Sequence, residues 1–212
     1  MSRDLFASDT PQALAAATFL LSGFALPGQD RLWRDIQEIL QTSPMRHMQT
    51  PGGFTMSVAM SNCGQLGWIT DRKGYRYSTI DPLTNQPWPA MPPSMQQLAT
   101  KAAAVCGFAG FLPDACLINR YAPGTRMSLH QDKNEQDYSA PIVSVSLGVS
   151  AIFQLGGMQR SDKTSRIALQ HGDVLVWGGE DRLRFHGVLP IKPQQHPLSG
   201  PDRINLTFRK AG

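Results

Sequence analysis

The sequence contains only three cysteines, and they form no recognisable pattern. Cys63, Cys106 and Cys116 are odd in number, and no two of them have the C-x-x-C spacing of a zinc or redox site. This argues against a disulfide framework and predicts reduced cytoplasmic thiols. The first residues, Met1 to Asp4, include an early acid and lack the layout of a signal peptide, which also predicts a cytoplasmic protein.

Long apolar runs are also missing from the sequence. Residues 13–26 form the most apolar window, and Thr18, Ser22 and Gly23 interrupt it, so no membrane span is expected. Only 17% of the 212 residues are charged and 41% are hydrophobic, which suits one globular domain over residues 1–212. The formal net charge of +4 permits a polyanionic partner but does not require one.

The N-terminal half predicts a helical cover followed by a flap. A short apolar strand over residues 18–24 precedes a helix with one apolar face, made by Leu32, Trp33, Ile36, Ile39 and Leu40. Pro27 comes before this helix, and Ser43-Pro44 ends it. Residues 45–93 combine a turn at 51–53, a predicted strand over 54–60 and aromatic residues among Gly, Pro, Asp and Asn. This mixture is typical of a recognition surface, so the flap is assigned to 45–93.

The remainder of the chain predicts one more helix and then mostly strands. The helix covers about Ser94 to Cys106. Short β-patterns follow at 115–121, 142–147, 151–155, 166–169, 173–177, 185–188 and 204–208. Such strands, separated by turn residues, favour a sandwich or barrel. The sequence therefore predicts a catalytic β-core over residues 113–212.

The motif His130-Gln131-Asp132 predicts a metal site together with the distant His186. Residues two apart in an extended strand project from one face, so His130 and Asp132 can approach the same atom. A second histidine from another strand completes two imidazoles and one carboxylate, the ligand set of non-haem Fe(II) oxygenases. The other histidines, at positions 47, 171 and 196, lie in loop-like or polar settings.

The segment 203–209 predicts an anion-binding strand. Arg203 and Arg209 are six residues apart, so they share a face with Asn205 and Thr207, while the alternate residues are apolar. Two guanidinium groups turned into a barrel need anions, and a dicarboxylate offers each planar fork a bidentate partner. Asn119 and Tyr121 supply further inward polar groups at period two.

Four longer segments carry a resemblance that goes beyond single motifs. They are residues 50–60 (TPGGFTMSVAM), 114–124 (DACLINRYAPG), 129–133 (LHQDK) and 205–209 (NLTFR). Through them, and over essentially the whole chain, the sequence resembles the AlkB family of bacterial Fe(II)- and 2-oxoglutarate-dependent DNA repair dioxygenases. The resemblance implies a mainly β fold with some α-helix: a double-stranded β-helix (jelly-roll) core with an N-terminal helical cover and a nucleotide-recognition flap.

The same resemblance implies the residues of the site. Fe(II) is expected on His130, Asp132 and His186, with O2 as a cosubstrate. The 2-oxoglutarate cosubstrate is expected on Asn119, Tyr121, Arg203, Asn205 and Arg209. The nucleotide site is expected to be lined by Trp68, Tyr75, Arg76, Tyr77, Asn134 and Arg160. The sequence departs from the family at two of these positions: Arg76 replaces a usually apolar residue, and Asn134 replaces an acid.

The implied activity is that of a DNA oxidative demethylase, an oxidoreductase of DNA alkylation repair. It removes N-methyl groups as formaldehyde from bases such as 1-methyladenine and 3-methylcytosine, while 2-oxoglutarate and O2 become succinate and CO2. The expected partner of the monomer is alkylated single- or double-stranded DNA, with RNA as a further candidate. Two alternatives stay open: a 2-oxoglutarate-dependent hydroxylase of a small molecule or protein side chain, and a nucleic-acid-binding protein without catalysis. The intact metal and anion sites argue against the second alternative.

Overall fold

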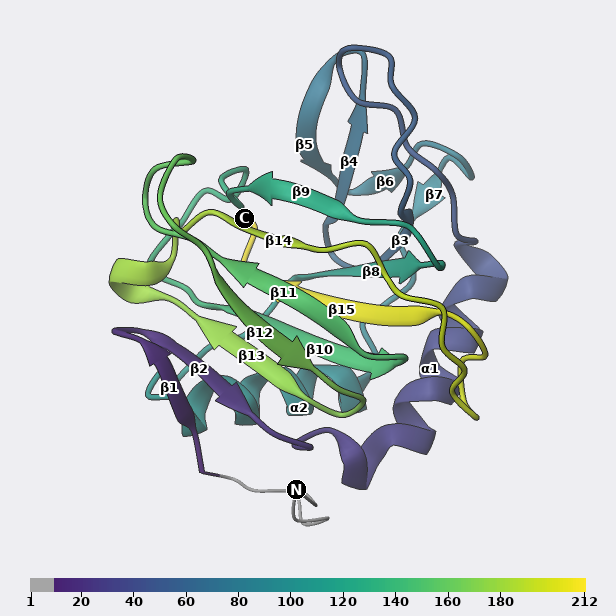
Figure 1. Ribbon diagram of the computed structural model, residues 1–212. Coiled ribbons are helices and arrows are strands. Elements are labelled where there is room, and N and C mark those ends of the chain that lie inside the picture. The colour runs from purple at the N-terminus through teal and green to yellow at the C-terminus, as the bar shows by residue number, and fades with distance from the viewer. Residues whose placement is uncertain (1–9) are drawn as a thin grey trace.

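The computed structural model describes residues 10–212 as two antiparallel β-sheets that enclose a core (Figure 1). The larger sheet has the strand order β1-β2-β13-β10-β15-β8-β3, and the smaller sheet has the order β12-β11-β14-β9. Residues 1–4, on which the expected cytoplasmic location partly rests, lie outside the described residues. Within residues 10–212, no helix has the length and apolar character needed to cross a membrane.

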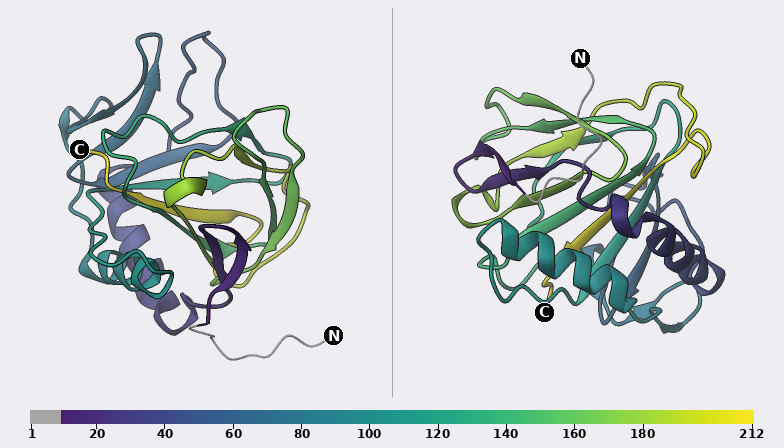
Figure 2. Two further views of the ribbon diagram at one scale, coloured as in Figure 1. Left: turned by 90° about the vertical axis from the view of Figure 1, so that its left-hand side faces the viewer. Right: turned by 90° about the horizontal axis from the view of Figure 1, so that it is seen from below.

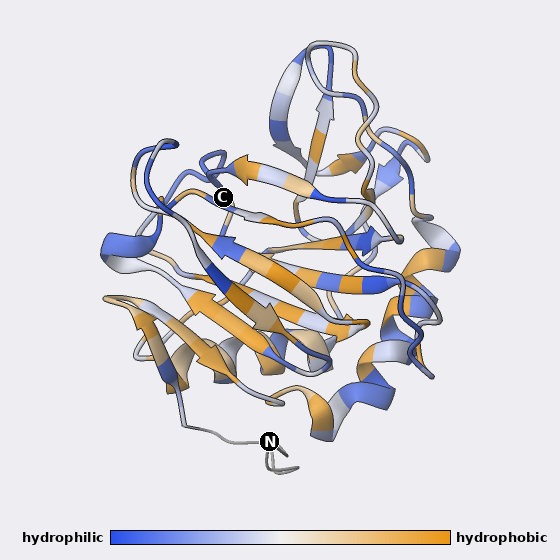
Figure 3. Cartoon of the chain, in the orientation of Figure 1, coloured by the Kyte–Doolittle hydropathy of each residue, from blue (hydrophilic) through white to orange (hydrophobic). Residues whose placement is uncertain are grey.

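The strands of the larger sheet are β1 (Gln12–Ala15), β2 (Thr18–Leu21), β3 (Ala59–Gly64), β8 (Ala115–Tyr121), β10 (Ile142–Gly148), β13 (Val174–Trp177) and β15 (Arg203–Arg209). Those of the smaller sheet are β9 (Met127–His130), β11 (Ala151–Leu155), β12 (Ser165–Leu169) and β14 (His186–Val188). β1, β2 and β3 thus extend the larger sheet beyond residues 113–212. Figure 3 shows how hydrophobic residues dominate β2, β10 and β13.

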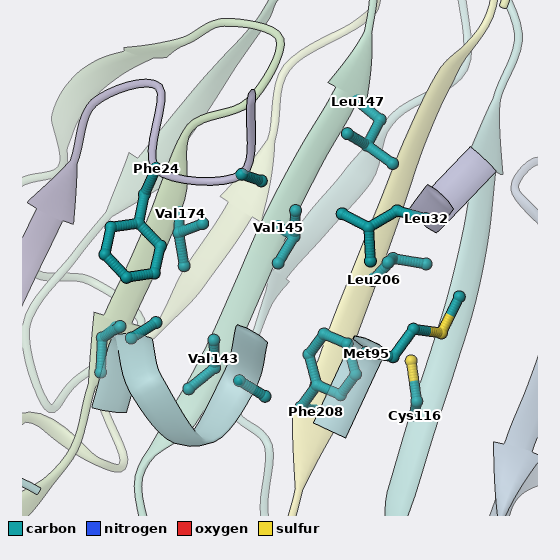
Figure 4. Close-up of a cluster of buried hydrophobic side chains, with 14 of the residues drawn as sticks. Phe24, Leu32, Met95, Cys116, Val143, Val145, Leu147, Val174, Leu206 and Phe208 are labelled. Atoms are coloured by element: carbon teal, nitrogen blue, oxygen red, sulfur yellow. The ribbon is translucent and has the colours of Figure 1, made fainter. Parts of the chain in front are cut away.

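Two helices cover the outer face of the larger sheet, as the view from below shows (Figure 2). α1 (Gln29–Thr42) buries Leu32, Ile36 and Ile39, which confirms the predicted apolar face. α2 (Pro93–Val105) contributes Met95 and three alanines to the same cluster. Alternate residues of β15, namely Ile204, Leu206 and Phe208, complete this cluster from the sheet side, and Figure 4 shows Leu206 and Phe208 in it. The opposite face of β15 is therefore left to polar side chains, as its period-two pattern predicts.

The second core lies between the two sheets. Its buried members include Leu117 and Leu175 from the larger sheet and Phe153, Leu155 and Val188 from the smaller one. These apolar side chains seal the space around the polar face of β15. The sandwich therefore provides a rigid, largely dry wall for a site between its sheets.

The segment between α1 and α2 carries two short hairpins, β4 (Gly67–Asp71) with β5 (Gly74–Ser78), and β6 (Ile80–Asp81) with β7 (Gln86–Pro87). Figure 1 shows β4 and β5 standing above β9. Asn62 fixes the start of β4, because its side chain donates to the Trp68 carbonyl and accepts from the Trp68 amide, both at 3.0 Å. The strand β3 thereby sets the position of the hairpin.

The strand predicted over residues 54–60 was wrong in its position, because β3 covers Ala59–Gly64. Residues 50–54 form a tight loop in which the amide of Thr50 donates to the carbonyl of Phe54, and Phe54 is 77% exposed. The strand continues through buried Ser61 and Asn62, which resemble turn residues in the sequence. Ser61 Oγ donates to the Ser43 carbonyl at 2.6 Å, so the buried hydroxyl keeps a hydrogen-bond partner.

Candidate metal and cosubstrate site

Three potential metal ligands meet where β9 pairs with β14, at the edge of the smaller sheet. His130 is the last residue of β9, His186 is the first of β14, and the two lie opposite each other in the sheet register. Asp132 lies just beyond the end of β9. The ligand atoms of all three side chains lie within 4.8 Å of one another, with Nε2–carboxylate distances of 3.7 Å for His130 and 3.8 Å for His186. The structure therefore brings together the predicted facial triad.

The hydrogen bonds of both histidines prepare Nε2 for a metal. Nδ1 of His130 lies 2.8 Å from the Ser128 carbonyl, and Nδ1 of His186 lies 3.0 Å from the Arg184 carbonyl. A carbonyl can only accept, so Nδ1 carries the proton and Nε2 keeps its lone pair. Burial, followed by repulsion from His130, lowers the pKa of His186 to about 4. His186 is therefore a neutral ligand at physiological pH.

The carboxylate of Asp132 is held by a buried cation. Arg209 Nη2 and Nε donate to Asp132 Oδ2 at 2.6 and 3.0 Å. Burial alone acts to raise the pKa of Asp132, but Arg209 and the two histidines outweigh it and hold this pKa well below its usual range. Asp132 is therefore an anionic ligand, as a divalent metal ion requires.

The five predicted cosubstrate residues line one cavity of about 770 Å³ together with the triad. The register of β8 and β15 explains how they meet, since Tyr121 lies opposite Arg203 and Asn119 lies opposite Asn205. Asn119 Nδ2 donates to Asn205 Oδ1 at 3.2 Å, and the Arg203 guanidinium lies 5.1 Å from the centre of the Tyr121 ring. The polar face of β15 therefore opens into the cavity.

The surroundings of Arg203 show whether the cavity suits an anion. Arg203 is 1% exposed, and its Nη2 donates to Ser146 Oγ at 2.9 Å. Arg203 Nε and Nη1 and the nearby Asn119 Oδ1 are buried without a partner among residues 10–212. Burial lowers the pKa of Arg203, partly offset by Tyr121. A buried cation with free donors fits a carboxylate ligand, so the residues suit a dicarboxylate such as 2-oxoglutarate.

The mouth of the cavity carries four of the six residues expected at the nucleotide site: Trp68, Tyr75, Asn134 and Arg160. The rings of Trp68 and Tyr75 are stacked, 5.7 Å apart at 19°. Trp68 Nε1 donates to Asn134 Oδ1 at 3.0 Å, which ties the hairpin to the segment that follows the metal ligand. Arg160 donates to the Leu129 carbonyl at 2.7 Å.

The other two expected residues lie outside the cavity lining. Arg76 is opposite Ile69 in the hairpin register, and its guanidinium pairs with Asp71 at 2.7 Å. Ile69 is the neighbour of Trp68 in β4, and neighbours in a strand point to opposite sides. Arg76 therefore lies on the face of the hairpin opposite to Trp68. Tyr77 lies behind the mouth, where its hydroxyl donates to Glu135 Oε1 at 2.6 Å. Burial raises the pKa of Tyr77, so it remains a neutral donor.

Several polar side chains around the site were not predicted from the sequence. Ser144 Oγ accepts from Asn205 Nδ2 at 2.8 Å, and Ser146 Oγ accepts from Arg203. A signal for both was present in the alternation of serine with valine along β10. Arg182 forms a buried ion pair with Glu135 next to the triad, and no periodic pattern indicates Arg182.

The fold and this ligand set together define a mononuclear iron centre beside an anion pocket. A family profile described as the 2OG-Fe(II) oxygenase superfamily matches residues 18–209. The chain belongs to this superfamily, so it is a dioxygenase that uses Fe(II), 2-oxoglutarate and O2.

Its sequence is 58% identical over 211 residues to alpha-ketoglutarate-dependent dioxygenase AlkB of Escherichia coli (strain K12), which covers 99% of this chain and 98% of that protein. It is 33% identical over 171 residues to DNA N(6)-methyladenine demethylase ALKBH1C of Arabidopsis thaliana, covering 68% of this chain and 38% of that protein. The solved structure of OsALKBH1 is similar at a TM-score of 0.80 and 29% identity, over 94% and 99% of the two chains. The predicted family, jelly-roll class and cofactors are confirmed.

Proposed function

We propose that the protein removes N-linked methyl groups oxidatively from bases in alkylated DNA and releases them as formaldehyde. The high identity to an AlkB dioxygenase and the similarity to a plant DNA N(6)-methyladenine demethylase support this reaction class. The structural observation that carries the proposal is the aromatic pair of Trp68 and Tyr75 at the mouth of a cavity that contains the triad. Stacked rings above a metal centre suit a base that has left its helix.

In this proposal the residues of the chain bind, orient and shield. His130, Asp132 and His186 hold Fe(II), which with 2-oxoglutarate and O2 supplies the oxidising power for hydroxylation of a methyl carbon. The two carboxylates of 2-oxoglutarate bind to the polar residues of β8 and β15, namely Asn119, Tyr121, Arg203, Asn205 and Arg209. The apolar wall between the sheets excludes water from the reacting centre.

The flap residues take the base in the same proposal. Trp68 and Tyr75 provide the stacking surface, and Asn134 offers a carbonyl and an amide to the base edge. Arg160 supplies positive charge near the mouth for a phosphate. Residues 45–93 then act as the recognition flap on a catalytic core built mainly from residues 113–212. RNA with the same lesion is a further candidate substrate, because the stacking surface does not read the sugar.

The proposal is tested by incubating the protein with Fe(II), 2-oxoglutarate and oligonucleotides that are methylated or unmethylated. Demethylation predicts that succinate and formaldehyde form in step with the methylated strand. Succinate formation without any response to the methylated strand would point to a hydroxylase of another substrate. Absence of succinate with every oligonucleotide would leave only nucleic-acid binding.

We expect Trp68→Ala or Tyr75→Ala to reduce use of methylated oligonucleotide more than uncoupled consumption of 2-oxoglutarate. Loss of one stacking surface costs about 1–3 kcal/mol per base, while the triad does not depend on either ring. The measurement compares KM for the oligonucleotide with the succinate rate in its absence. Tyr75→Phe, which keeps the ring, is the matched control and should stay close to the unaltered protein. Equal loss of both activities would assign the rings a purely structural role.

We expect Asn134→Asp to increase the preference for cationic lesions over neutral ones, such as an exocyclic etheno adduct. Aspartate can still accept the Trp68 hydrogen bond, and it adds a negative charge near the base. At about 4 Å that charge contributes between roughly 1 kcal/mol in water and roughly 4 kcal/mol at an effective dielectric of 20. The readout is the ratio of kcat/KM for a cationic and a neutral lesion in the same oligonucleotide. An unchanged ratio would show that position 134 does not sense the charge of the base.

A further inference from the structure

The segment between β9 and β10 has functional residues but no regular structure. Residues 131–141 include the metal ligand Asp132, the mouth residue Asn134 and the ring of Tyr138, and they belong to no strand or helix. One backbone hydrogen bond connects this segment to the rest of the described chain, from the Gln136 amide to the Ala211 carbonyl at 3.2 Å. A segment without a ladder needs other partners for its backbone groups if it is to keep one conformation.

A single buried arginine provides two of these partners, and Gln131 Nε2 adds a bond from the segment to the Leu183 carbonyl at 2.6 Å. Arg182 Nη1 donates to the Asp132 carbonyl at 2.8 Å, and Nε donates to the Ala140 carbonyl at 3.1 Å. Nη2 donates to Glu135 Oε2 at 3.0 Å, and the guanidinium lies 5.5 Å from the centre of the Tyr138 ring. The side chains of Arg182 and Glu135 are 3% and 2% exposed. One planar group therefore contacts the beginning, middle and end of the segment.

Arg182 lies in the connector between β13 and β14, and hydrogen bonds hold this connector in place. It follows the short helix η2 (Gly179–Asp181), and its amide donates to the Gly179 carbonyl at 3.1 Å. The Asp181 carboxylate accepts from the Ala17 amide at 2.7 Å and from Thr18 Oγ1 at 2.9 Å, which ties the connector to the larger sheet. Four residues after Arg182 the same connector reaches the second metal-ligand histidine.

We propose that Arg182 is a positioning residue that sets the metal ligand Asp132 and the recognition segment from one point. Its bond to the Asp132 carbonyl fixes the peptide plane that follows this residue, and hence the direction in which the carboxylate leaves the backbone. Its pairing with Glu135 keeps that acid turned to the interior, where Glu135 also accepts from Tyr77. Asn134 is then left facing Trp68 at the mouth. The statement about recognition rests on the proposed function, whereas the statement about Asp132 does not.

The geometry of the guanidinium is essential to this role, and its charge alone is insufficient. Three acceptors lie around one plane, and an arginine fork can reach them together from a single rotamer. A lysine at position 182 keeps a positive charge for Glu135, but its single ammonium cannot also hold the two carbonyls of Asp132 and Ala140 in the same geometry. Arg182→Lys therefore separates positioning from simple charge compensation.

The test compares Arg182→Lys with Arg184→Lys. Arg184 lies on the same connector and pairs with Asp181, but its side chain contacts the Gly156 carbonyl and not the 131–141 segment. In the metal-free protein we expect Arg182→Lys to speed amide hydrogen exchange across 131–141. With Co(II) as the probe we expect its affinity to fall about 10- to 100-fold, the usual effect of losing a group that orients a metal ligand. Arg184→Lys should leave both quantities close to those of the unaltered protein.

A third measurement concerns substrate. Arg182→Lys should raise KM for a methylated oligonucleotide in addition to lowering metal affinity, because both depend on the same segment. If Arg182→Lys proves too unstable to purify, the double variant Arg182→Gln, Glu135→Gln removes both buried charges, with Glu135→Gln as its control, and should show the same losses.

The proposal is overturned if Arg182→Lys retains the exchange protection and Co(II) affinity of the unaltered protein, or if Arg184→Lys loses them equally. Neither quantity involves nucleic acid. A protein that fails to demethylate any oligonucleotide while these two quantities respond would therefore contradict the proposed function and leave the positioning role intact. If the unaltered protein demethylates the oligonucleotide but Arg182→Lys changes neither amide exchange nor Co(II) affinity, the positioning role is contradicted and the proposed function stands.

Discussion

Replacing His130, Asp132 or His186 by alanine is expected to reduce succinate formation to background. The three ligand atoms lie within 4.8 Å of one another, and no fourth histidine, cysteine or acid of residues 10–212 joins this metal-binding group. Loss of one ligand therefore leaves two, which cannot hold an iron ion in a defined geometry. Turnover and Co(II) affinity should be lost together, because both depend on the same three atoms.

The control for the metal variants is His196→Ala. His196 lies against His171, with ring centres 4.4 Å apart, and neither ring lines the cavity. Its removal should leave turnover and Co(II) affinity in place. Full activity in any of the three ligand variants would reject the triad assignment.

The three variants should also differ in stability before any metal is added. Asp132→Ala removes the carboxylate that accepts two hydrogen bonds from buried Arg209, whose remaining acid is Glu135 at 3.4 Å. Breaking a buried ion pair from one side is strongly destabilising, by about 3–5 kcal/mol when the remaining charge has no other partner. His130→Ala has no such cost. In the metal-free protein, thermal unfolding should therefore begin at a lower temperature for Asp132→Ala than for His130→Ala.

The elements that the sequence predicted well are those whose residues repeat with a regular period. β8 and β11 have the predicted bounds, β15 is one residue longer at each end, and the remaining predicted strands of the core differ by one residue at one end. In β15, period two separated the apolar residues under the helices from the polar residues in the cavity. The strand near residue 54 was misplaced because buried Ser61 and Asn62 look like turn residues, and only partners distant in the chain make them suitable for a strand.

The site divides in the same way. The triad and the arginine face follow from local spacing and from the chemistry of the side chains. Arg182 does not, because its three acceptors lie 42, 47 and 50 residues away, all in one irregular segment. Arg76 and Tyr77 illustrate a second limit. The family resemblance placed both beside neighbouring Tyr75, but alternation along β5 turns Arg76 to the opposite face, and Tyr77 is drawn inward by Glu135.

Arg203→Leu is expected to weaken 2-oxoglutarate binding sharply without lowering the stability of the ligand-free protein. The guanidinium is fully buried with two nitrogen atoms unpartnered among the described residues, so its charge is a cost until an anion arrives. Leucine is shorter and uncharged, so it removes the cost of burying the charge. In the absence of 2-oxoglutarate, the free energy of unfolding of Arg203→Leu should therefore equal or exceed that of the unaltered protein.

Addition of 2-oxoglutarate should make the unaltered protein more stable than Arg203→Leu. Each hydrogen bond from a charged donor contributes roughly 1.5–3 kcal/mol, so the variant should bind about tenfold to over a hundredfold more weakly for every bond that is lost. A ligand that binds only the native state raises stability by about 2.7 kcal/mol at a hundred times its Kd. The unaltered protein should gain this increment at concentrations where Arg203→Leu gains almost none. The measurement is thermal unfolding across a 2-oxoglutarate titration with a redox-inert metal.

Arg120→Leu is the matched control. Arg120 directly precedes Tyr121 in β8, and its side chain is 46% exposed. It should keep the increment from 2-oxoglutarate. Arg209→Leu should behave differently from both: it loses cosubstrate affinity, but it also strips Asp132 of its cation, so its ligand-free stability should fall. An Arg203→Leu protein that is destabilised without ligand and yet keeps the full increment with it would show that Arg203 serves the packing of the sheet. In that case the anion must bind elsewhere in the cavity.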